Sequence, residues 1–180
     1  MEKMNVNNKE FKVIKLLGKG KGGYSYLVED ELKNKFVLKQ IHHEPCAYYN
    51  FGNKIEAELN DYKRLLDAKI RIPLMIDADI QQERILKEYI DGETIVYYVK
   101  NDLMNESFYQ QIEEMVSLLK LKNLNIDYYP TNFIVQGGSI YYIDYECNNY
   151  SEEWNYKNWG SKYWSKTIEF CRDFEKVEDK

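Results

Sequence analysis

The sequence predicts an α+β fold, in which an antiparallel N-terminal sheet carries one helix and a reduced C-terminal part is mostly helical. Strand-length apolar runs come first, an amphipathic pattern of helical period follows, and a second helical pattern precedes a short hairpin. The expected strands are 11–17, 24–28, 36–41, 72–78, 84–90, 133–135 and 140–143, and the expected helices are 55–66 and 108–121. We expect the polar and aromatic tail from residue 148 to add helical pieces.

The bulk composition narrows the class of protein. The 180 residues, 44% hydrophobic and 31% charged, suit one domain, 1–180, with parts 1–91 and 92–180. A net charge of −5 without a long basic run argues against a nucleic-acid partner. No apolar run of about 18 residues and no signal-like N-terminus occur, so we expect no membrane partner. Three scattered cysteines, Cys46, Cys147 and Cys171, predict reduced thiols and a cytoplasmic location.

The first two strands, 11–17 and 24–28, flank a glycine-rich segment. Gly18-Lys19-Gly20-Lys21-Gly22-Gly23 matches G-x-G-x-x-G. In a dinucleotide-binding fold this string opens a helix, whereas a strand-like segment follows it here. A strand–glycine–strand hairpin can lie over nucleotide phosphates, because its backbone approaches closely where no side chain intervenes. An ordinary glycine-rich turn is the alternative.

The third strand, 36–41, places a lysine between apolar neighbours. With period-2 alternation, Val37, Lys39 and Ile41 share one face. The amine of Lys39 either reaches solvent at the sheet edge or contacts a phosphate from a buried position. Its place after the glycine segment favours the phosphate contact.

The helix 55–66 offers a carboxylate partner for that lysine, which a buried amine requires. Glu58 lies on the core-facing stripe of the helix, whereas Glu56 lies on the polar side. We therefore expect Glu58 to pair with Lys39. The alternative is a solvated Glu58 at the helix edge.

Residues 125–135 form the most specific segment of the chain, and a second expected helix precedes them. Helix 108–121 has the apolar face Ile112, Met115, Val116 and Leu119. Strands 133–135 and 140–143 are expected to pair around the turn 136–139. That pairing brings Asn132, at the start of the hairpin, close to Asp144 at its end.

An amide oxygen and a carboxylate at one position suit Mg²⁺, which takes few protein ligands and its remaining ligands from water and phosphates. Asp127 lies five residues before Asn132, in a loop broken by Pro130. It can reach the same place without binding the metal, and so can accept a proton from a substrate hydroxyl. Each residue taken singly could instead form a turn.

In order and approximate spacing, these residues resemble the protein-kinase-like superfamily, whose fold is bilobal. Asp127-Tyr-Tyr-Pro-Thr-Asn132 resembles the D-x-x-P-x-N loop of Ser/Thr protein kinases. Asp144-Tyr145-Glu146 stands where those enzymes carry D-F-G, and its D-x-E form is more similar to choline and ethanolamine kinases. Residues 87–93 resemble the hinge. The resemblance extends over about residues 11–146. Because few residues follow Asp144, the chain is also similar to RIO-type and other minimal bacterial-type kinases.

The resemblance implies ATP and Mg²⁺ as cofactors. It implies that Asp127 and Lys39 are catalytic and that Asn132 and Asp144 bind the metal. The implied nucleotide-binding residues are Gly18, Gly20, Gly23, Val37, Lys39 and Glu58, with the backbones of Glu88 and Ile90 at the adenine.

Several positions depart from the pattern of the superfamily. Asn125-Ile126 replaces the His-Arg pair, and Tyr129 replaces the lysine that contacts the γ-phosphate. Ser25 replaces a valine over the adenine, and Lys87 stands at the gatekeeper position. No A-P-E string follows Asp144, so the helices that bind peptide substrates are expected to be absent.

The expected function is therefore transfer of the γ-phosphate of ATP to a hydroxyl group. A protein Ser/Thr is the first choice of acceptor, in a Ser/Thr protein kinase-like enzyme. A small amino alcohol or aminoglycoside-like molecule is the alternative. The lost His-Arg pair and Tyr129 also leave a nucleotide-binding pseudokinase, acting as a partner module, as an alternative.

Two further groups of residues need an interpretation. The tail tryptophans Trp154, Trp159 and Trp164 could form an aromatic pocket for a cationic substrate, but we favour packing in a region short of helices. His42, His43 and Cys46 suggest a metal site but lack an evident fourth ligand, so a loop before the helix is favoured.

Overall fold

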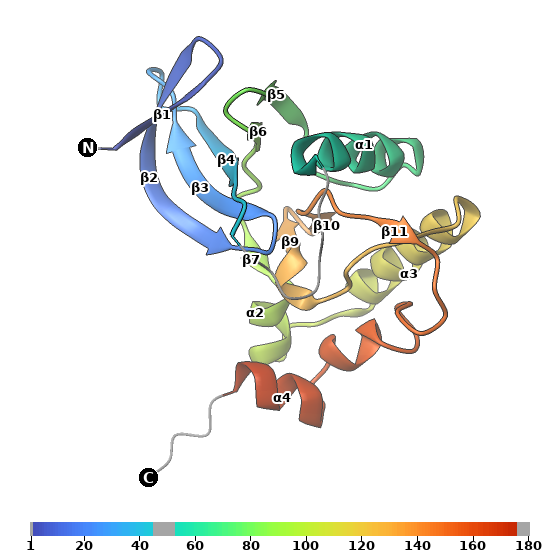
Figure 1. Ribbon diagram of the computed structural model, residues 1–180. Coiled ribbons are helices and arrows are strands. Elements are labelled where there is room, and N and C mark those ends of the chain that lie inside the picture. Colours follow the sequence, from blue (N-terminus) through green and yellow to red (C-terminus); the bar gives the residue numbers. More distant parts are fainter. Residues whose placement is uncertain (1, 45–52, 176–180) are drawn as a thin grey trace. The chain divides into compact units, whose positions relative to one another are not determined.

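The computed structural model describes residues 2–44 and 53–175 (Figure 1). Its chain divides into two compact units. Unit 1 consists of Met1–Asn60 and Pro73–Tyr89, and unit 2 of Asp61–Ile72 and Ile90–Lys180. The described residues have the α+β class that the sequence predicts.

The described part of unit 1 contains a curled sheet of six antiparallel strands in the order β1-β2-β3-β4-β6-β5 (Figure 1). These are β1 Lys3–Val6, β2 Lys9–Lys19, β3 Gly23–Glu29, β4 Lys35–Ile41, β5 Met75–Asp79 and β6 Arg84–Glu88. Helix α1, Lys54–Asp67, begins in this unit. The antiparallel N-terminal sheet and its helix are therefore as predicted. The strand β1 was not predicted, because four residues are too few to establish a period.

One face of the sheet carries the core of unit 1. Its buried members are Met4, Val6, Phe11, Val28, Leu38 and Leu86. Phe36 packs against this cluster and meets Phe11 edge to face, with ring centroids 5.8 Å apart. Because side chains alternate along a strand, Val37 and Lys39 are directed to the opposite face of β4. The core thus determines which side of the sheet receives the lysine.

The carboxylate of Asp79, the last residue of β5, accepts hydrogen bonds from two backbone N–H groups. The β1–β2 turn has Asn7 in the left-handed region, with φ 51°, and its N–H donates to Asp79 Oδ2 at 2.8 Å. Asp79 also accepts from the N–H of Gln82 at 3.0 Å. These bonds, from Gln82 first and then from Asn7, hold the pKa of the buried Asp79 carboxyl below its ordinary value.

We therefore expect Asp79→Asn to make unfolding less dependent on acid. A lowered pKa in the folded state gives stability that is present above the unfolded pKa, about 3.9, and lost as pH falls through the folded value. The wild-type melting temperature should fall steeply below about pH 4, and the slope should be shallower in the variant. At pH 7 the variant should melt a few degrees lower. Melting curves from pH 2 to 7 measure both effects, and parallel curves would contradict the assignment.

The described part of unit 2 combines short strands with helices of very different length (Figure 1). Strands β10, β9 and β7 form one small sheet, and β11 pairs with β8. The strands are β7 Glu93–Thr94, β8 Leu124–Asn125, β9 Phe133–Gln136, β10 Ser139–Tyr142 and β11 Asn148–Asn149. The helices are α2 Ile95–Lys100, α3 Glu106–Leu121 and α4 Ile168–Phe174, with 3₁₀ turns at Pro130–Asn132 and Gly160–Tyr163.

The helix and the hairpin predicted in this unit are present. The side chain of Asn105 caps α3 by accepting the N–H of Phe108 at 3.2 Å. Phe108, Ile112, Met115 and Leu119 form its buried face. In the β9–β10 hairpin, Ile140 lies opposite Val135, and both central residues of the turn, Gly137 and Gly138, have positive φ. Two such residues make the tight turn that matches strand twist.

The prediction of a mostly helical C-terminal part was wrong. Helices α2, α3 and α4 have only 6, 16 and 7 residues, and turns and short strands occupy most of the rest of the described segment. In the tail, Asn155 Oδ1 accepts the N–H of Asn158 at 2.7 Å, and Asn158 Nδ2 donates to the carbonyl of Glu152 at 2.7 Å. Asparagine side chains that bond nearby backbone groups favour turns over helix.

Two observations bear on the environment of the chain. Within the described residues, no helix combines the length and apolar character needed to cross a membrane. Cys147, which is buried, and Cys171 are free thiols, whereas Cys46 lies outside the described residues.

Candidate functional site

The glycine segment forms the tip of the β2–β3 hairpin, where Gly18 lies opposite Ser25 and Gly20 N–H donates to Gly23 O at 2.9 Å. The sheet itself requires Gly23, because a Cβ there would lie 2.4 Å from the carbonyl oxygen of Gln40. A Cβ on Gly18 would meet no described atom within 4 Å, and one on Gly20 only the Gly23 oxygen, at 3.9 Å. Neither has a positive φ, so the described fold does not explain why residues 18 and 20 are glycines.

The predicted ion pair is present on the face of the sheet opposite the core. Lys39 Nζ donates to Glu58 Oε1 at 2.8 Å, and the two side chains are only 12% and 11% exposed. A Cβ on Gly22 would lie 3.6 Å from Lys39 Nζ, so the amine lies beside the glycine hairpin. A buried ion pair adds little net stability, because desolvation offsets the attraction. The pair therefore does not by itself account for the stability of the sheet.

The two residues whose backbones are predicted to contact adenine belong to different units, Glu88 to unit 1 and Ile90 to unit 2. Val37 lies in β4 opposite Leu27 and Lys87. The N–H of Glu88 donates to Leu74 O at 2.8 Å. A contact from the Glu88 backbone to adenine would therefore use its carbonyl oxygen. The side chain of Ile90 is buried.

In unit 2, the segment from Asp127 to Asn132 is a loop held by its own hydrogen bonds. The carboxylate of Asp127 accepts the N–H of Tyr129 at 3.0 Å. Asn132 Nδ2 donates to the carbonyl of Asp127 at 3.3 Å, and the N–H of Ile143 donates to Asn132 O at 2.9 Å. The backbones of residues 132 and 143 are thus joined, as expected if Asn132 and Asp144 lie at the two ends of one hairpin.

A buried tyrosine links strand β10 to the acidic segment that follows it. Tyr142 is fully buried, and its hydroxyl donates to the carbonyl of Glu146 at 2.8 Å. Its pKa is raised far above the ordinary value by burial first, and then by the charges of Asp144, Asp127 and Glu146. Sequence reasoning did not select Tyr142, although its inward position beside Ile140 follows from strand alternation.

No protein-family model and no curated protein matches this sequence. The roles of the site residues therefore follow from their chemistry and positions.

The donor set in unit 2 fits Mg²⁺ better than a transition metal. Because Asn132 Nδ2 is bound to Asp127 O, its side-chain oxygen is free of that bond and can serve as an acceptor. Asn132 and Asp144 would then offer one amide and one carboxylate oxygen. Among the described residues, no group of three or more His, Cys, Asp or Glu side chains is arranged to hold a metal ion. Phosphate oxygens and water would complete the Mg²⁺ coordination.

Aromatic side chains of the tail pack around Tyr129, which stands where the resemblance predicts a lysine. The ring of Tyr129 lies 5.0 Å from that of Tyr163, 5.3 Å from Phe174 and 6.4 Å from Trp159. Its hydroxyl donates to Asp173 at 3.0 Å, and burial, followed by this bond, raises the pKa of Tyr129 to about 12. The packing interpretation of the tail is therefore favoured over a cationic pocket.

The two histidines have other contacts. His42 Nε2 lies 3.1 Å from Gly20 O, and His43 Nε2 lies 2.5 Å from Glu83 Oε2. The third residue of the suggested metal site, Cys46, cannot be placed because it lies outside the described residues.

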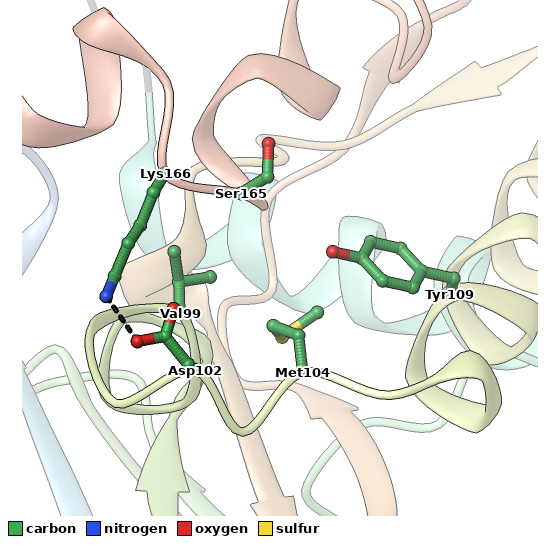
Figure 2. A pocket seen from close by; sticks show the side chains of 6 residues that line it. All are labelled: Val99, Asp102, Met104, Tyr109, Ser165 and Lys166. Carbon is green, nitrogen blue, oxygen red and sulfur yellow. Dashed lines mark hydrogen bonds and ion pairs between the residues drawn. The ribbon is translucent and has the colours of Figure 1, made fainter.

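A separate pocket of about 210 Å³ lies in unit 2 (Figure 2). It is lined by Val99, Asp102, Met104, Tyr109, Ser165 and Lys166. Lys166 Nζ donates to Asp102 Oδ2 at 2.6 Å at its rim. None of the predicted site residues lines this pocket.

Proposed function

We propose that the chain is an ATP- and Mg²⁺-dependent phosphotransferase that moves the γ-phosphate to a hydroxyl group. The glycine hairpin covers the phosphates, and Lys39, oriented by Glu58, contacts them. Asn132 and Asp144 hold Mg²⁺, which supplies neutralisation of phosphate charge when bound. Asp127 orients the acceptor hydroxyl and accepts its proton.

The observation that carries this proposal is the Lys39–Glu58 pair beside the glycine hairpin. A lysine with 12% exposure is held at 2.8 Å by a carboxylate from another element. It lies beside Gly22, in the same hairpin as glycines 18 and 20, which the fold itself does not require. A glycine backbone open to close approach and an oriented ammonium group both suit a phosphate chain.

The acceptor is proposed to be a protein Ser/Thr, with a small alcohol as the alternative. Labelled ATP, a cell lysate and the purified chain, with and without Mg²⁺, test the reaction. Products are then separated by mass. Mg²⁺-dependent label in proteins supports the first choice, and label confined to small metabolites supports the alternative.

The cytoplasmic location of the protein stays a prediction.

A nucleotide-binding partner module without turnover is the second candidate, and Tyr129 favours it. The tyrosine packs into the aromatic cluster where the resemblance expects a lysine on the γ-phosphate. A thermal shift with Mg²⁺ and ATP, combined with no label in either product class, would select this module. Absence of any nucleotide-induced shift would remove both candidates.

Single alanine substitutions of the glycines should separate a folding role from a ligand role. Gly23→Ala should destabilise unit 1 by about 1–3 kcal/mol, because the new Cβ meets the Gln40 backbone. Gly18→Ala and Gly20→Ala should change stability by less than about 0.5 kcal/mol and still weaken ATP binding. Urea unfolding and ATP titration measure the two effects. Wild-type affinity in both of the latter variants would show that their glycines do not face the nucleotide.

A further inference from the structure

The segment that follows β4 is tied to the glycine hairpin by several contacts. The N–H of His42 donates to Gly22 O at 3.3 Å, and its ring Nε2 lies 3.1 Å from Gly20 O. The ring of Tyr24 meets the His42 ring edge to face, with centroids 5.2 Å apart. The half-buried His42 therefore holds both backbone and side-chain contacts to the tip of the hairpin.

The partners of the imidazole determine which nitrogen carries the proton. A carbonyl oxygen can only accept, so Nε2 donates to Gly20 O. The N–H of Glu44 donates to Nδ1 at 3.3 Å, so Nδ1 is the acceptor. His42 thus joins residue 20 to residue 44 through its two ring nitrogens.

Glu44 adds charged contacts to the same hairpin. Its carboxylate accepts from Lys19 Nζ at 2.6 Å and from the Tyr24 hydroxyl. Lys19 and Glu44 are about half exposed, so solvent and salt screen their attraction.

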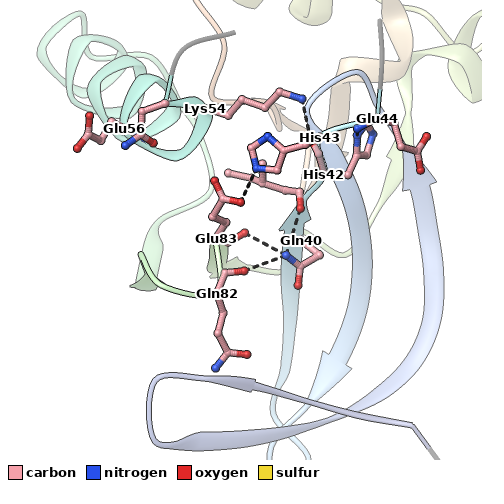
Figure 3. Close-up of polar contacts among 10 residues, drawn as sticks. Gln40, His42, His43, Glu44, Lys54, Glu56, Gln82 and Glu83 are labelled. Atoms are coloured by element: carbon pink, nitrogen blue, oxygen red, sulfur yellow. Dashed lines mark hydrogen bonds and ion pairs between the residues drawn. The ribbon is translucent and has the colours of Figure 1, made fainter.

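His42 also connects the hairpin to the helix that carries Glu58. Lys54, which is 8% exposed, donates from Nζ to the carbonyl of His42 at 2.6 Å (Figure 3). Lys54 and Glu58 are one helical turn apart on α1. The first turn of α1 is therefore anchored to His42 at one end and to Lys39 at the other. His43 points instead to Glu83 (Figure 3).

We propose that His42 is a positioning residue, whose Nε2–H bond to Gly20 holds the glycine hairpin in the conformation that binds the nucleotide phosphates. This inference rests on the proposed function. His42 acts through the hairpin and through α1, and it need not touch the nucleotide.

A matched pair of variants isolates the bond. In His42→Gln, the side-chain amide N–H can replace Nε2–H at Gly20, whereas the shorter His42→Asn offers an acceptor to Glu44 only. Amide hydrogen exchange of residues 18–24, without nucleotide, should be about three- to tenfold faster in His42→Asn and near wild type in His42→Gln. The Kd for ATP with Mg²⁺ should rise by a similar factor in His42→Asn alone, with kcat at saturation nearly unchanged.

His43→Asn serves as the control and should match wild type in both measurements. The inference is overturned if His42→Asn exchanges and binds like wild type, or if His42→Gln is as impaired as His42→Asn. Faster exchange without weaker ATP binding also overturns it. A wild-type chain that binds no ATP removes the proposed function instead, and the exchange data then still decide whether His42 holds the hairpin.

Discussion

Asp127→Asn is expected to lower the turnover number of phosphotransfer by about 10²- to 10⁴-fold, the usual contribution of a general base. The asparagine oxygen can still accept the N–H of Tyr129, which the carboxylate accepts at 3.0 Å in the wild type. The loop should therefore keep its shape while the basic oxygen is lost. Initial rates at saturating ATP and Mg²⁺ measure the effect, and the KM for ATP should change little.

Lys39→Ala is the companion arm of the same experiment, because it removes a charged contact to phosphate. We expect kcat/KM for ATP to fall about 10- to 100-fold. The loss also leaves the Glu58 carboxylate, 11% exposed, without its lysine, so stability should fall too. Lys12→Ala is the matched control, since Lys12 pairs with Glu29 at 2.9 Å on the same sheet.

Turnover in the Lys12→Ala control should equal that of the wild type. Asp102→Asn, in an exposed pair with Lys166, is the corresponding control for Asp127. Activity in Asp127→Asn and Lys39→Ala that cannot be distinguished from the wild type would remove the phosphotransferase proposal. Loss in the controls as well would indicate general destabilisation.

Trp164→Ala is expected to destabilise unit 2 by about 3–5 kcal/mol, a large part of the stability of a domain. Trp164 is fully buried and packs edge to face against Phe133 and Tyr156, with ring centroids 5.0 and 5.6 Å away. Its Nε1–H donates to the carbonyl of Tyr128 at 2.9 Å. Removal leaves a large cavity and a buried carbonyl without its donor. Urea unfolding followed by far-UV circular dichroism measures the loss.

Trp154→Ala is the matched control, because Trp154 is 51% exposed. It should cost less than about 1 kcal/mol. Trp164→Phe keeps the ring contacts but loses the bond to Tyr128 O, so its effect should lie between those of the two alanine variants. Equal losses in Trp164→Ala and Trp154→Ala would contradict the packing role of the tail.

Local pattern predicted the elements in which periodicity is strong. The strand 36–41 and the helix 108–121 became β4 and α3 with shifts of at most two residues. The hairpin around Gly137 and Gly138 was equally clear, since two glycines supply the positive φ that its turn needs. The Lys39–Glu58 pair followed from alternation on a strand combined with the stripe on a helix.

Periodicity did not predict the turns of the C-terminal tail. Asn155 and Asn158 bond to nearby backbone groups and stop helix formation, but residue type alone does not show when an asparagine does so. The very short strands β7, β8 and β11 have no measurable period, so they form only because partner strands are in place.

The sequence by itself determined the α+β class, the glycine hairpin, the lysine–glutamate pair and the hairpin that joins residues 132 and 143. Each depends on spacing within one or two adjacent elements. Only the tertiary structure decided that Gly23 serves the sheet while Gly18 and Gly20 do not, that the buried Tyr142 hydroxyl donates to the carbonyl of Glu146, and that His42 contacts Gly20. These depend on distances between atoms in the folded chain, which periodicity does not encode.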